Sequence, residues 1–288
     1  MSKPKILLQL DTDDQPSVFD AVVAVDSGVD HLLRHHGIRP ENVRDRVHGA
    51  IFTRGVSDLA STAIFVGGSD VALGERVLAA VQQAFVGPMR VSVLLDSNGA
   101  NTTAAAAVLA ARKHLDLSQT TALVLGGTGP VGRRAAQLLA REGAVVRVGS
   151  RDAARAAAVC RDVAALVPEA KLAPVAAGNV DETIQALIGC ELVIAAGAAG
   201  VELLPADARR NAAALRTAID LNAVPPAGIG GIEIFDKATD HSGVVCYGAL
   251  GVGGTKMKIH KAAVRELFER NDRVLDAAEV YEIGKALA

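Results

Sequence analysis

The chain has 288 residues, of which half are hydrophobic, and a formal net charge of -2, a length that suits one large or two modest domains. This near-neutral charge excludes a basic surface for nucleic acid. The chain also lacks a signal peptide and any run of roughly 20 apolar residues, so we expect a cytoplasmic protein that binds neither nucleic acid nor membrane.

Strands and helices alternate over the first hundred residues. The apolar patterns predict strands at 5–11, 61–68 and 91–97, and helices at 17–35 and 70–85. Because parallel strands need helical crossovers, the alternation predicts an α/β domain with a mainly parallel sheet. An alanine-rich helix over 103–115 then leads to a second domain.

A glycine-rich turn is the clearest motif of the chain. Residues 121–132, TALVLGGTGPVG, form an apolar strand, a turn and the start of a helix, and a second strand follows at 144–148. Such glycines let the backbone approach a pyrophosphate, whose charge is met by free amides at the helix N-terminus. The motif predicts a dinucleotide site made by Gly127, Thr128, Gly129, Pro130, Val131 and Gly132.

The end of the second strand selects between NAD and NADP in domains of this kind. Ser150 offers a hydroxyl, Arg151 offers a planar guanidinium suited to phosphate, and Arg155 follows one helical turn later. The pattern predicts NADP, with NAD as the lesser alternative because Asp152 offers a carboxylate to a ribose. In the other interpretation, both arginines are solvated residues in the first turn of the next helix.

The remaining patterns complete a Rossmann-type, doubly wound parallel sheet. They predict helices at 153 onward, 181–187, 255–271 and 276–287, strands at 172–175, 191–195 and 215–223, and glycine- and proline-rich turns between 225 and 254. We expect the last helices to pack back on the first domain. The predicted domains are therefore 1–112 with 270–288, and 113–269, with a cleft between them.

Ligands of open α/β sheets bind beyond the carboxyl ends of the strands. Four segments rich in small residues follow predicted strands or join helices, namely 96–103, 197–200, 220–226 and 248–256. Asp20, near the start of the first helix, also faces the predicted cleft.

Six segments together resemble one known family: DTDDQPSVFDAVVAVDSGVDH, STAIFVGG, LLDSNGANTTAAA, VLGGTGPVG, LNAVPPAGIGGIE and GALGVGGTKMKIHKA. Through them the chain resembles, from end to end, the methylene-tetrahydromethanopterin dehydrogenases of methylotrophic bacteria, in particular the NADP-dependent type. The resemblance implies oxidation of the methylene bridge of a reduced pterin to a methenyl bridge, with reduction of NADP, in formaldehyde oxidation. It further implies a pterin-binding N-terminal domain, some use of methylene-tetrahydrofolate or NAD, and a homo-oligomer, either a trimer or a hexamer.

The resemblance also directs the assignment of site residues. Two flanking nitrogens delocalise the charge that hydride loss leaves on the pterin, so no protein acid or base is obligatory, but a nearby carboxylate helps. Asp20 and Asp96 are the candidates for this carboxylate or for accepting the N–H groups of the pterin, and we expect Lys256, with Asn98, to donate to the pterin carbonyl. Further expected contacts are Ser17, Phe19, Asp96, Asn98 and Thr102 for the substrate, and Ala196, Gly197 and Asn222 for the cofactor.

Structural interpretations of the same residues stay open. Lys256 fits the solvated face of a helix, together with Lys258 and Lys261. Asp20 fits an exposed first-turn carboxylate favoured by the helix dipole. Asp96, Asn98 and Thr102 fit a helix cap before the alanine run.

The chain lacks residues on which two related enzyme families depend. Shikimate dehydrogenases and folate dehydrogenase-cyclohydrolases have related Rossmann domains but use a first-domain lysine, and none lies between Lys5 and Lys113. The only tyrosines are Tyr247 and Tyr281, so we expect no cyclohydrolase activity. The alternatives that remain are an NADPH-binding redox sensor without turnover, and a dehydrogenase acting mainly on methylene-tetrahydrofolate.

A resident metal is not expected. Three widely spaced cysteines, Cys160, Cys190 and Cys246, indicate neither disulfides nor a zinc site. His31 and His35 lie one helical turn apart in the predicted helix but have no third ligand. Pro16 stands where a calcium loop around Asp11 would need glycine.

Overall fold

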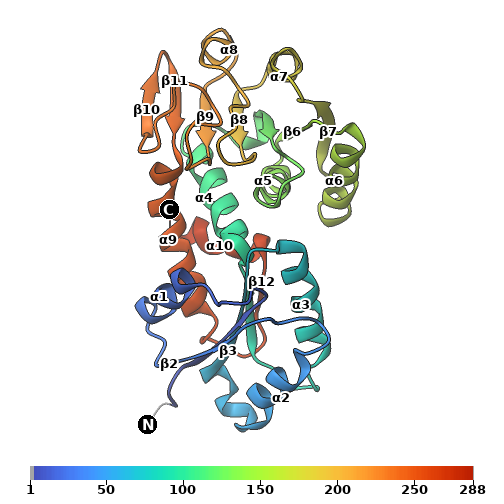
Figure 1. The fold of residues 1–288 in the computed structure, drawn as a ribbon, viewed down its shortest axis with the longest axis vertical. Coiled ribbons are helices and arrows are strands. Elements are labelled where there is room, and N and C mark those ends of the chain that lie inside the picture. Colours follow the sequence, from blue (N-terminus) through green and yellow to red (C-terminus); the bar gives the residue numbers. More distant parts are fainter. Residues whose placement is uncertain (1–2, 288) are drawn as a thin grey trace. The chain divides into compact units, whose positions relative to one another are not determined.

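The computed structural model describes residues 3–287, which divide into two compact units (Figure 1). Unit 1 contains the described residues up to Thr102 and those from Met257 onward, and unit 2 is Thr103–Lys256. The division falls inside two helices, α4 (Ala100–Arg112) and α9 (Ala249–Glu266). The predicted domain boundaries lie just after the ends of these helices, and the predicted cleft stays a prediction.

Unit 1 is built on five parallel strands in the order β12-β4-β3-β1-β2. Its remaining elements, in chain order, are β1 (Ile6–Asp11), α1 (Val18–Asp26), β2 (His31–His35), α2 (Arg44–Phe52), η1 (Val56–Ser61), β3 (Thr62–Gly67), α3 (Val71–Gln83), β4 (Ser92–Leu95), η2 (Ser97–Gly99), β12 (Val274–Leu275) and α10 (Ala277–Ala286).

The two faces of this sheet differ in chemistry. Successive strand residues point to opposite faces, and Leu8, Ile64 and Val93 pack with α2 and α3 into one apolar core. The alternate positions place Asp11 and Phe65 on the opposite face. A buried carboxylate in a parallel sheet, which is normally apolar on both sides, marks that face as the one with a polar function.

The helix predicted over 17–35 is wrong beyond Asp26. Gly28 adopts a φ of 85°, which ends the helical path. His31 to His35 then form β2, which pairs in parallel with β1. The side chains of β2 are mostly exposed, so their sequence carries no clear strand alternation.

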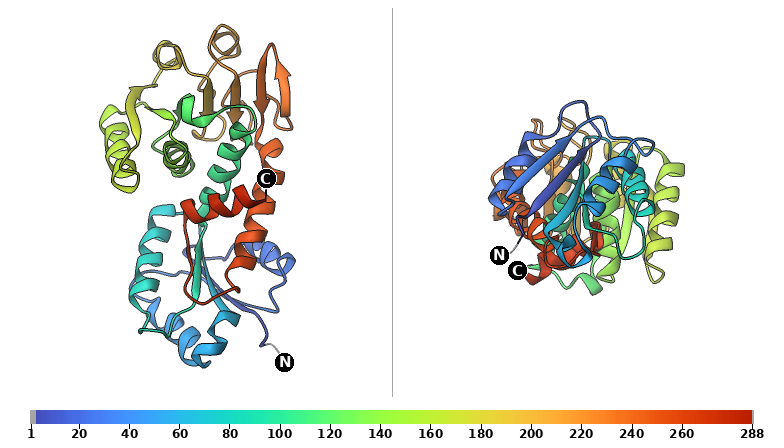
Figure 2. Two further views of the ribbon diagram at one scale, coloured as in Figure 1. Left: turned by 180° about the vertical axis from the view of Figure 1, so that it is seen from behind. Right: turned by 90° about the horizontal axis from the view of Figure 1, so that it is seen from below.

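Unit 2 contains a seven-stranded sheet in the order β10-β11-β9-β8-β5-β6-β7, in which β10 alone is antiparallel. Figure 1 labels these strands, and Figure 2 shows the same ribbon from two further sides. Its elements are η3 (Leu117–Gln119), β5 (Thr121–Leu125), α5 (Pro130–Arg141), β6 (Val145–Ser150), α6 (Ala153–Leu166), β7 (Lys171–Ala176), α7 (Val180–Leu187), β8 (Leu192–Ala195), α8 (Ala206–Arg210), β9 (Thr217–Asp220), β10 (Lys237–His241) and β11 (Val244–Tyr247).

The order of these strands confirms the predicted α/β class and Rossmann-type sheet. From β5 the chain first moves outward through β6 and β7, and then returns to the other side of β5 through β8, β9 and β11. The reversal between β5 and β8 is the topological switch point at which ligands of doubly wound sheets bind.

The turn predicted around Gly251 is also wrong, because α9 begins at Ala249, earlier than the predicted 255. A Cβ added at Gly251 would lie 1.7 Å from the carbonyl oxygen of Asp236. The glycine is therefore required for close helix-to-loop contact rather than for a turn. The described residues contain no helix that is long and apolar enough to cross a membrane.

Candidate active site

The turn between β5 and α5 is shaped as a phosphate cradle. Gly129 precedes α5 and has no side chain to cap it, and Pro130 occupies the first helical turn. A Cβ added at Gly132 would lie 2.3 Å from the carbonyl oxygen of Gly126. The first-turn amides therefore stay open to an anion, and the residues fit a dinucleotide. Of the six residues predicted for this role, Gly127, Thr128 and Gly129 form the turn, and Pro130, Val131 and Gly132 form the first turn of α5.

The end of β8 lies directly beside this turn. The amide of Ala196 donates to the carbonyl oxygen of Leu125 at 2.9 Å. A Cβ added at Gly126 would lie 2.6 Å from the Cα of Gly197. The structure thus brings together the glycine turn and two further residues predicted for the cofactor, at the switch point of the sheet.

The end of β6 presents two cations. Ser150 is buried, and its hydroxyl accepts the amide of Asp152 at 3.1 Å. The Asp152 carboxylate accepts the amide of Arg155 at 3.0 Å and so caps α6. Arg151 and Arg155 are exposed, and no ion pair within the described chain engages either guanidinium. Both guanidinium groups remain available for a phosphate, while one oxygen of the Asp152 carboxylate caps the helix.

A polar cavity of about 330 Å³ lies at the carboxyl end of β9. Its wall includes Asp220, whose carboxylate accepts the amides of Asn222 at 3.0 Å and Ile229 at 3.1 Å. Burial raises the pKa of Asp220, and these amides oppose the rise. The side chain of Asn222, predicted to contact the cofactor, donates to the carbonyl oxygen of Pro226 at 2.9 Å. It therefore also shapes the loop after β9.

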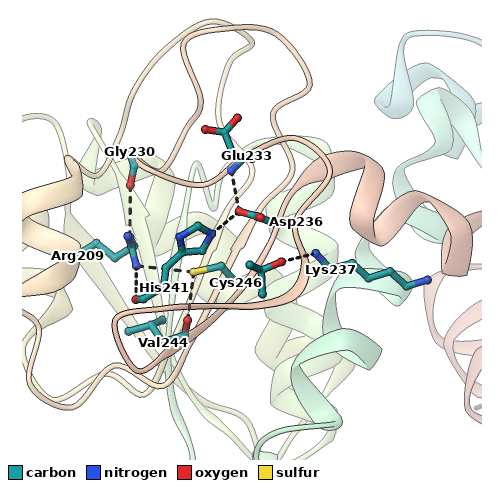
Figure 3. A network of polar contacts seen from close by, with 9 residues as sticks. Arg209, Gly230, Glu233, Asp236, Lys237, His241, Val244 and Cys246 are labelled. Atoms are coloured by element: carbon teal, nitrogen blue, oxygen red, sulfur yellow. Dashed lines mark hydrogen bonds and ion pairs between the residues drawn. The ribbon is translucent and has the colours of Figure 1, made fainter.

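The far wall of this cavity is held by the network in Figure 3. The buried Arg209 guanidinium donates to the carbonyl oxygens of Gly230 and His241 at 3.3 and 3.2 Å. Asp236 lies 2.7 Å from the His241 ring nitrogen. Arg209 also approaches Cys246 Sγ at 3.7 Å, yet burial still raises the pKa of this thiol to about 11.

A larger, apolar cavity of about 560 Å³ lies between α7 and α8. It is lined by none of the predicted site residues and lies away from the strand ends, so we assign it no part in the chemistry.

In unit 1 the strand ends bring carboxylates together. Asp11 pairs with Gly67 across β1 and β3. The amide of Asp96 donates to the carbonyl oxygen of Val66 at 3.1 Å and so continues the pairing of β3 with β4. A Cβ added at Gly67 would lie 3.4 Å from an Asp11 oxygen and 3.5 Å from an Asp20 oxygen. Asp11 is buried, and it accepts the amide of Ser17 at 2.9 Å, before α1. Sequence reasoning missed Asp11 as part of this site.

The carboxylate of Asp96 is fully engaged by the start of α4. It accepts the amides of Asn101 and Thr102 at 2.9 and 3.1 Å, and the Thr102 hydroxyl at 2.7 Å. This is the geometry of the helix-cap interpretation. Asp96 and Thr102 are both buried, whereas Asn98 is exposed in the left-handed region at a φ of 54°. Their assignment to the substrate stays a prediction.

His260 on α9 completes the unit 1 cluster. It is only 1% exposed, and its Nδ1 lies 3.9 Å from an Asp96 oxygen. The ring stacks on Phe65 at 5.7 Å and lies 6.2 Å from Phe19, which is half exposed. Sequence reasoning missed His260, although it lies in the KMKIHKA segment, four residues and therefore one helical turn after Lys256.

Comparisons with known proteins agree with these features. A family model described as methylene-tetrahydromethanopterin dehydrogenase, N-terminal, matches residues 18–98. The bifunctional protein MdtA of Methylorubrum extorquens is 47% identical over the full length of both chains. The NAD(P)-dependent methylenetetrahydromethanopterin dehydrogenase of the same organism is 32% identical over 94% of this chain and 95% of its own.

Solved structures show the fold alone at lower identity. Shikimate 5-dehydrogenase from Listeria monocytogenes has a TM-score of 0.57 at 15% identity and covers 99% of this chain and 96% of its own. Quinate dehydrogenase from Corynebacterium glutamicum, in complex with NAD, has a TM-score of 0.52 at 15% identity. The match covers 99% of this chain and 100% of the quinate dehydrogenase chain. On the strength of the full-length relatives, the chain belongs to the methylenetetrahydromethanopterin dehydrogenase family.

Proposed function

We propose that this protein oxidises methylene-tetrahydromethanopterin to the methenyl form by hydride transfer to NADP, in one-carbon metabolism. The observation that carries the proposal is the 32% identity, over nearly the whole chain, to a relative named for this activity. The open amide cradle of unit 2 supports the same conclusion, because a dinucleotide enzyme needs such a cradle for the pyrophosphate.

We further propose that unit 1 binds the pterin and unit 2 binds NADP, which supplies the hydride acceptor. Asp20 is close to the buried carboxylate of Asp11 at the unit 1 strand ends, and carboxylates there stabilise the positive charge that develops on the pterin. Phe19 offers a half-exposed ring to a flat ligand. Lys256 donates to the pterin carbonyl, and Ser17 and Asn98 add polar contacts.

The proposed preference for NADP rests on Arg151 and Arg155. A guanidinium matches the geometry of a phosphate through paired N–H donors. Asp152, the acid that would favour NAD by bonding the ribose, is committed to the first turn of α6.

We propose that the enzyme does not hydrolyse its methenyl product. Between Lys5 and Lys113 the chain has no lysine. Tyr247 is a buried residue of unit 2 whose hydroxyl lies 2.8 Å from a His114 ring nitrogen, and Tyr281 is fully buried in α10. The lysine beside Tyr281 is Lys285, 5.3 Å from the ring centroid on the same helix α10, and neither tyrosine belongs to the segment before Lys113 in which the related cyclohydrolases carry their lysine.

We also propose that the protein works in the cytoplasm as a homo-oligomer. The three cysteines are free thiols, as a reducing compartment requires. Val18, Val22 and Val25 form an exposed apolar row on α1, which supports association of subunits. Sedimentation of the purified protein tests the oligomer, and a monomer at micromolar concentration would contradict it.

The decisive experiment measures NADPH formation by purified protein with methylene-tetrahydromethanopterin and with methylene-tetrahydrofolate, each with NADP and with NAD. Fast turnover of the methanopterin with NADP is expected. Faster turnover of the folate would make the protein a folate dehydrogenase. Tight NADPH binding without turnover of either pterin would make it a redox sensor. Loss of methenyl product in the same assay would contradict the absence of hydrolysis.

A further inference from the structure

We propose that His260 is a positioning residue of the pterin site, which holds the ring of Phe19 in place for the substrate. The inference rests on the proposed function, because it gives His260 a part in binding the pterin rather than the dinucleotide. His260 belongs to unit 1, although it lies on the helix that also supplies Lys256.

The sheet directs His260 to the polar face of unit 1. Phe65 lies two residues before Gly67 on β3, and therefore on the same face as the Asp11 carboxylate that pairs beside Gly67. A Cβ added at Gly67 would lie 3.0 Å from the Phe65 ring and 3.5 Å from an Asp20 oxygen. The ring on which His260 stacks thus borders the carboxylate that we assign to the reaction.

Two aromatic contacts connect His260 to the surface of unit 1. Its ring is stacked on Phe65 at 5.7 Å with planes 22° apart, and lies 6.2 Å from Phe19 with planes 37° apart. Both distances are within the range of favourable ring pairs. Phe19 is 50% exposed while His260 is 1% exposed, so one part of the Phe19 ring is supported from inside and another part is available to a ligand.

The inner side of His260 faces a rigid frame. Its Nδ1 lies 3.9 Å from Asp96, whose oxygens accept two amides and a hydroxyl at the start of α4. Asn101, in the same turn, donates to Asp276 before α10 at 2.9 Å. A ring anchored on this frame fixes Phe19 before the substrate arrives, which reduces the entropy lost on binding.

The test compares two substitutions that separate the ring from its nitrogens. His260→Phe keeps an aromatic ring, and His260→Gln keeps a polar group but removes the ring. Val264→Ala is the matched control, because Val264 is equally buried one turn further along α9. Steady-state KM values for the methylene pterin and for NADP are measured with all variants, together with kcat and Tm.

His260→Gln is expected to raise the pterin KM about tenfold, a change of about 1.4 kcal/mol in binding, while the NADP KM changes less than about twofold. His260→Phe is expected to recover most of the pterin KM. Val264→Ala is expected to lower Tm without changing either KM. Equal rises of both KM values in His260→Gln, or a His260→Phe variant as impaired as His260→Gln, would overturn the inference.

A second measurement starts from the half-exposed ring of Phe19 itself and uses a double variant. If His260 acts by holding Phe19, then Phe19→Ala raises the pterin KM by itself, and adding His260→Gln changes it little further. Independent, additive effects would refute the positioning role. Wild-type protein without turnover of any pterin would refute the proposed function instead, so the two failures are distinguishable.

Discussion

The carboxylate of Asp152, at the end of β6, has a structural role that affects which dinucleotide its neighbours Arg151 and Arg155 can bind. Asp152 caps α6, and its oxygen is held by the amide of Arg155. A ribose hydroxyl of NAD would have to share this carboxylate with the helix, while a 2′-phosphate finds two exposed guanidinium groups.

Arg151→Asp is expected to lower kcat/KM for NADP about 100-fold, because a charge-assisted bond of a few kcal/mol is lost and a repulsive charge replaces it. The value for NAD is expected to change less than about threefold. Initial rates with both dinucleotides at saturating pterin measure the two ratios.

Arg161→Asp is the control for this charge reversal. Arg161 is an exposed arginine within α6, ten residues after Arg151, which precedes the helix. It lies about 12 Å along the helix axis from Ala153, the first residue of α6. Both kcat/KM values of this variant should match the wild type. Equal losses with NADP and NAD in Arg151→Asp would remove Arg151 from the 2′-phosphate site.

Which site residues a sequence reveals depends on how far along the chain their partners lie. The cradle residues are consecutive, so their spacing alone predicted the turn. Ser150 and Arg151 were predicted for the same reason. His260 and Asp11 were missed because a single buried histidine or aspartate has no local signature. Their place in the site became visible only from their neighbours: Asp11 pairs with Gly67, and His260 stacks on Phe65. The sequence alone does not show which residues the sheet register brings together.

Among the elements, the β5–α5 turn depends most strictly on its backbone. Gly132→Ala would place a methyl group 2.3 Å from the Gly126 carbonyl oxygen, with backbone rather than a flexible side chain in the way. We expect it to cost about 1–3 kcal/mol of stability, and to weaken NADPH binding at least about tenfold because the amides of α5 move. Thermal unfolding and a fluorescence titration with NADPH measure these effects.

The control for this prediction is Gly49→Ala. Gly49 lies in the exposed interior of α2, and a Cβ there meets nothing within 4 Å. It should stabilise the protein by about 0.5–1 kcal/mol through helix propensity. A Gly132→Ala variant that matches this control, with normal NADPH affinity, would show that the turn tolerates a side chain.

The elements that sequence patterns did not reveal are those whose conformation depends on distant partners. Helices such as α3 and α5 bury one face, so their own periodicity predicted them. In contrast, β2 and β10 are mostly exposed edge strands, and β12 has only two residues. Each exists because a neighbouring strand supplies the hydrogen bonds, and a single-sequence pattern contains no information on that neighbour.

At the scale of the whole molecule, the buried thiol of Cys246 couples stability to alkaline pH. Its pKa is raised from 9.0 to about 11 in the folded protein. The unfolded chain therefore releases this proton first, so the contribution of the thiol to stability is complete below pH 9. It is lost as pH rises toward 11.

Cys246→Ala should accordingly lose less unfolding free energy between pH 8 and about pH 11 than the wild type. Urea unfolding at several pH values gives the free energy of unfolding against pH for both proteins. The cavity left by the substitution lowers this free energy at every pH, so the two proteins are compared by the slopes of their curves. Cys160→Ala serves as the comparison: burial also raises the pKa of this half-buried thiol, but less than that of Cys246, so a smaller change in slope is expected. Parallel curves for wild type and Cys246→Ala would contradict the prediction.

The division of the chain into units has a consequence for biosynthesis. Unit 2 is continuous, whereas unit 1 is interrupted by it and is completed only by residues from Met257 onward. During translation, all of unit 2 is synthesised before β12. Until then β4 lacks the strand that pairs with it and forms an open edge of the sheet. Because domains generally fold as units during translation, we expect unit 2 to become protease-resistant first. We expect the nascent N-terminal segment to stay open to proteases until the later part of α9, β12 and α10 emerge to complete unit 1.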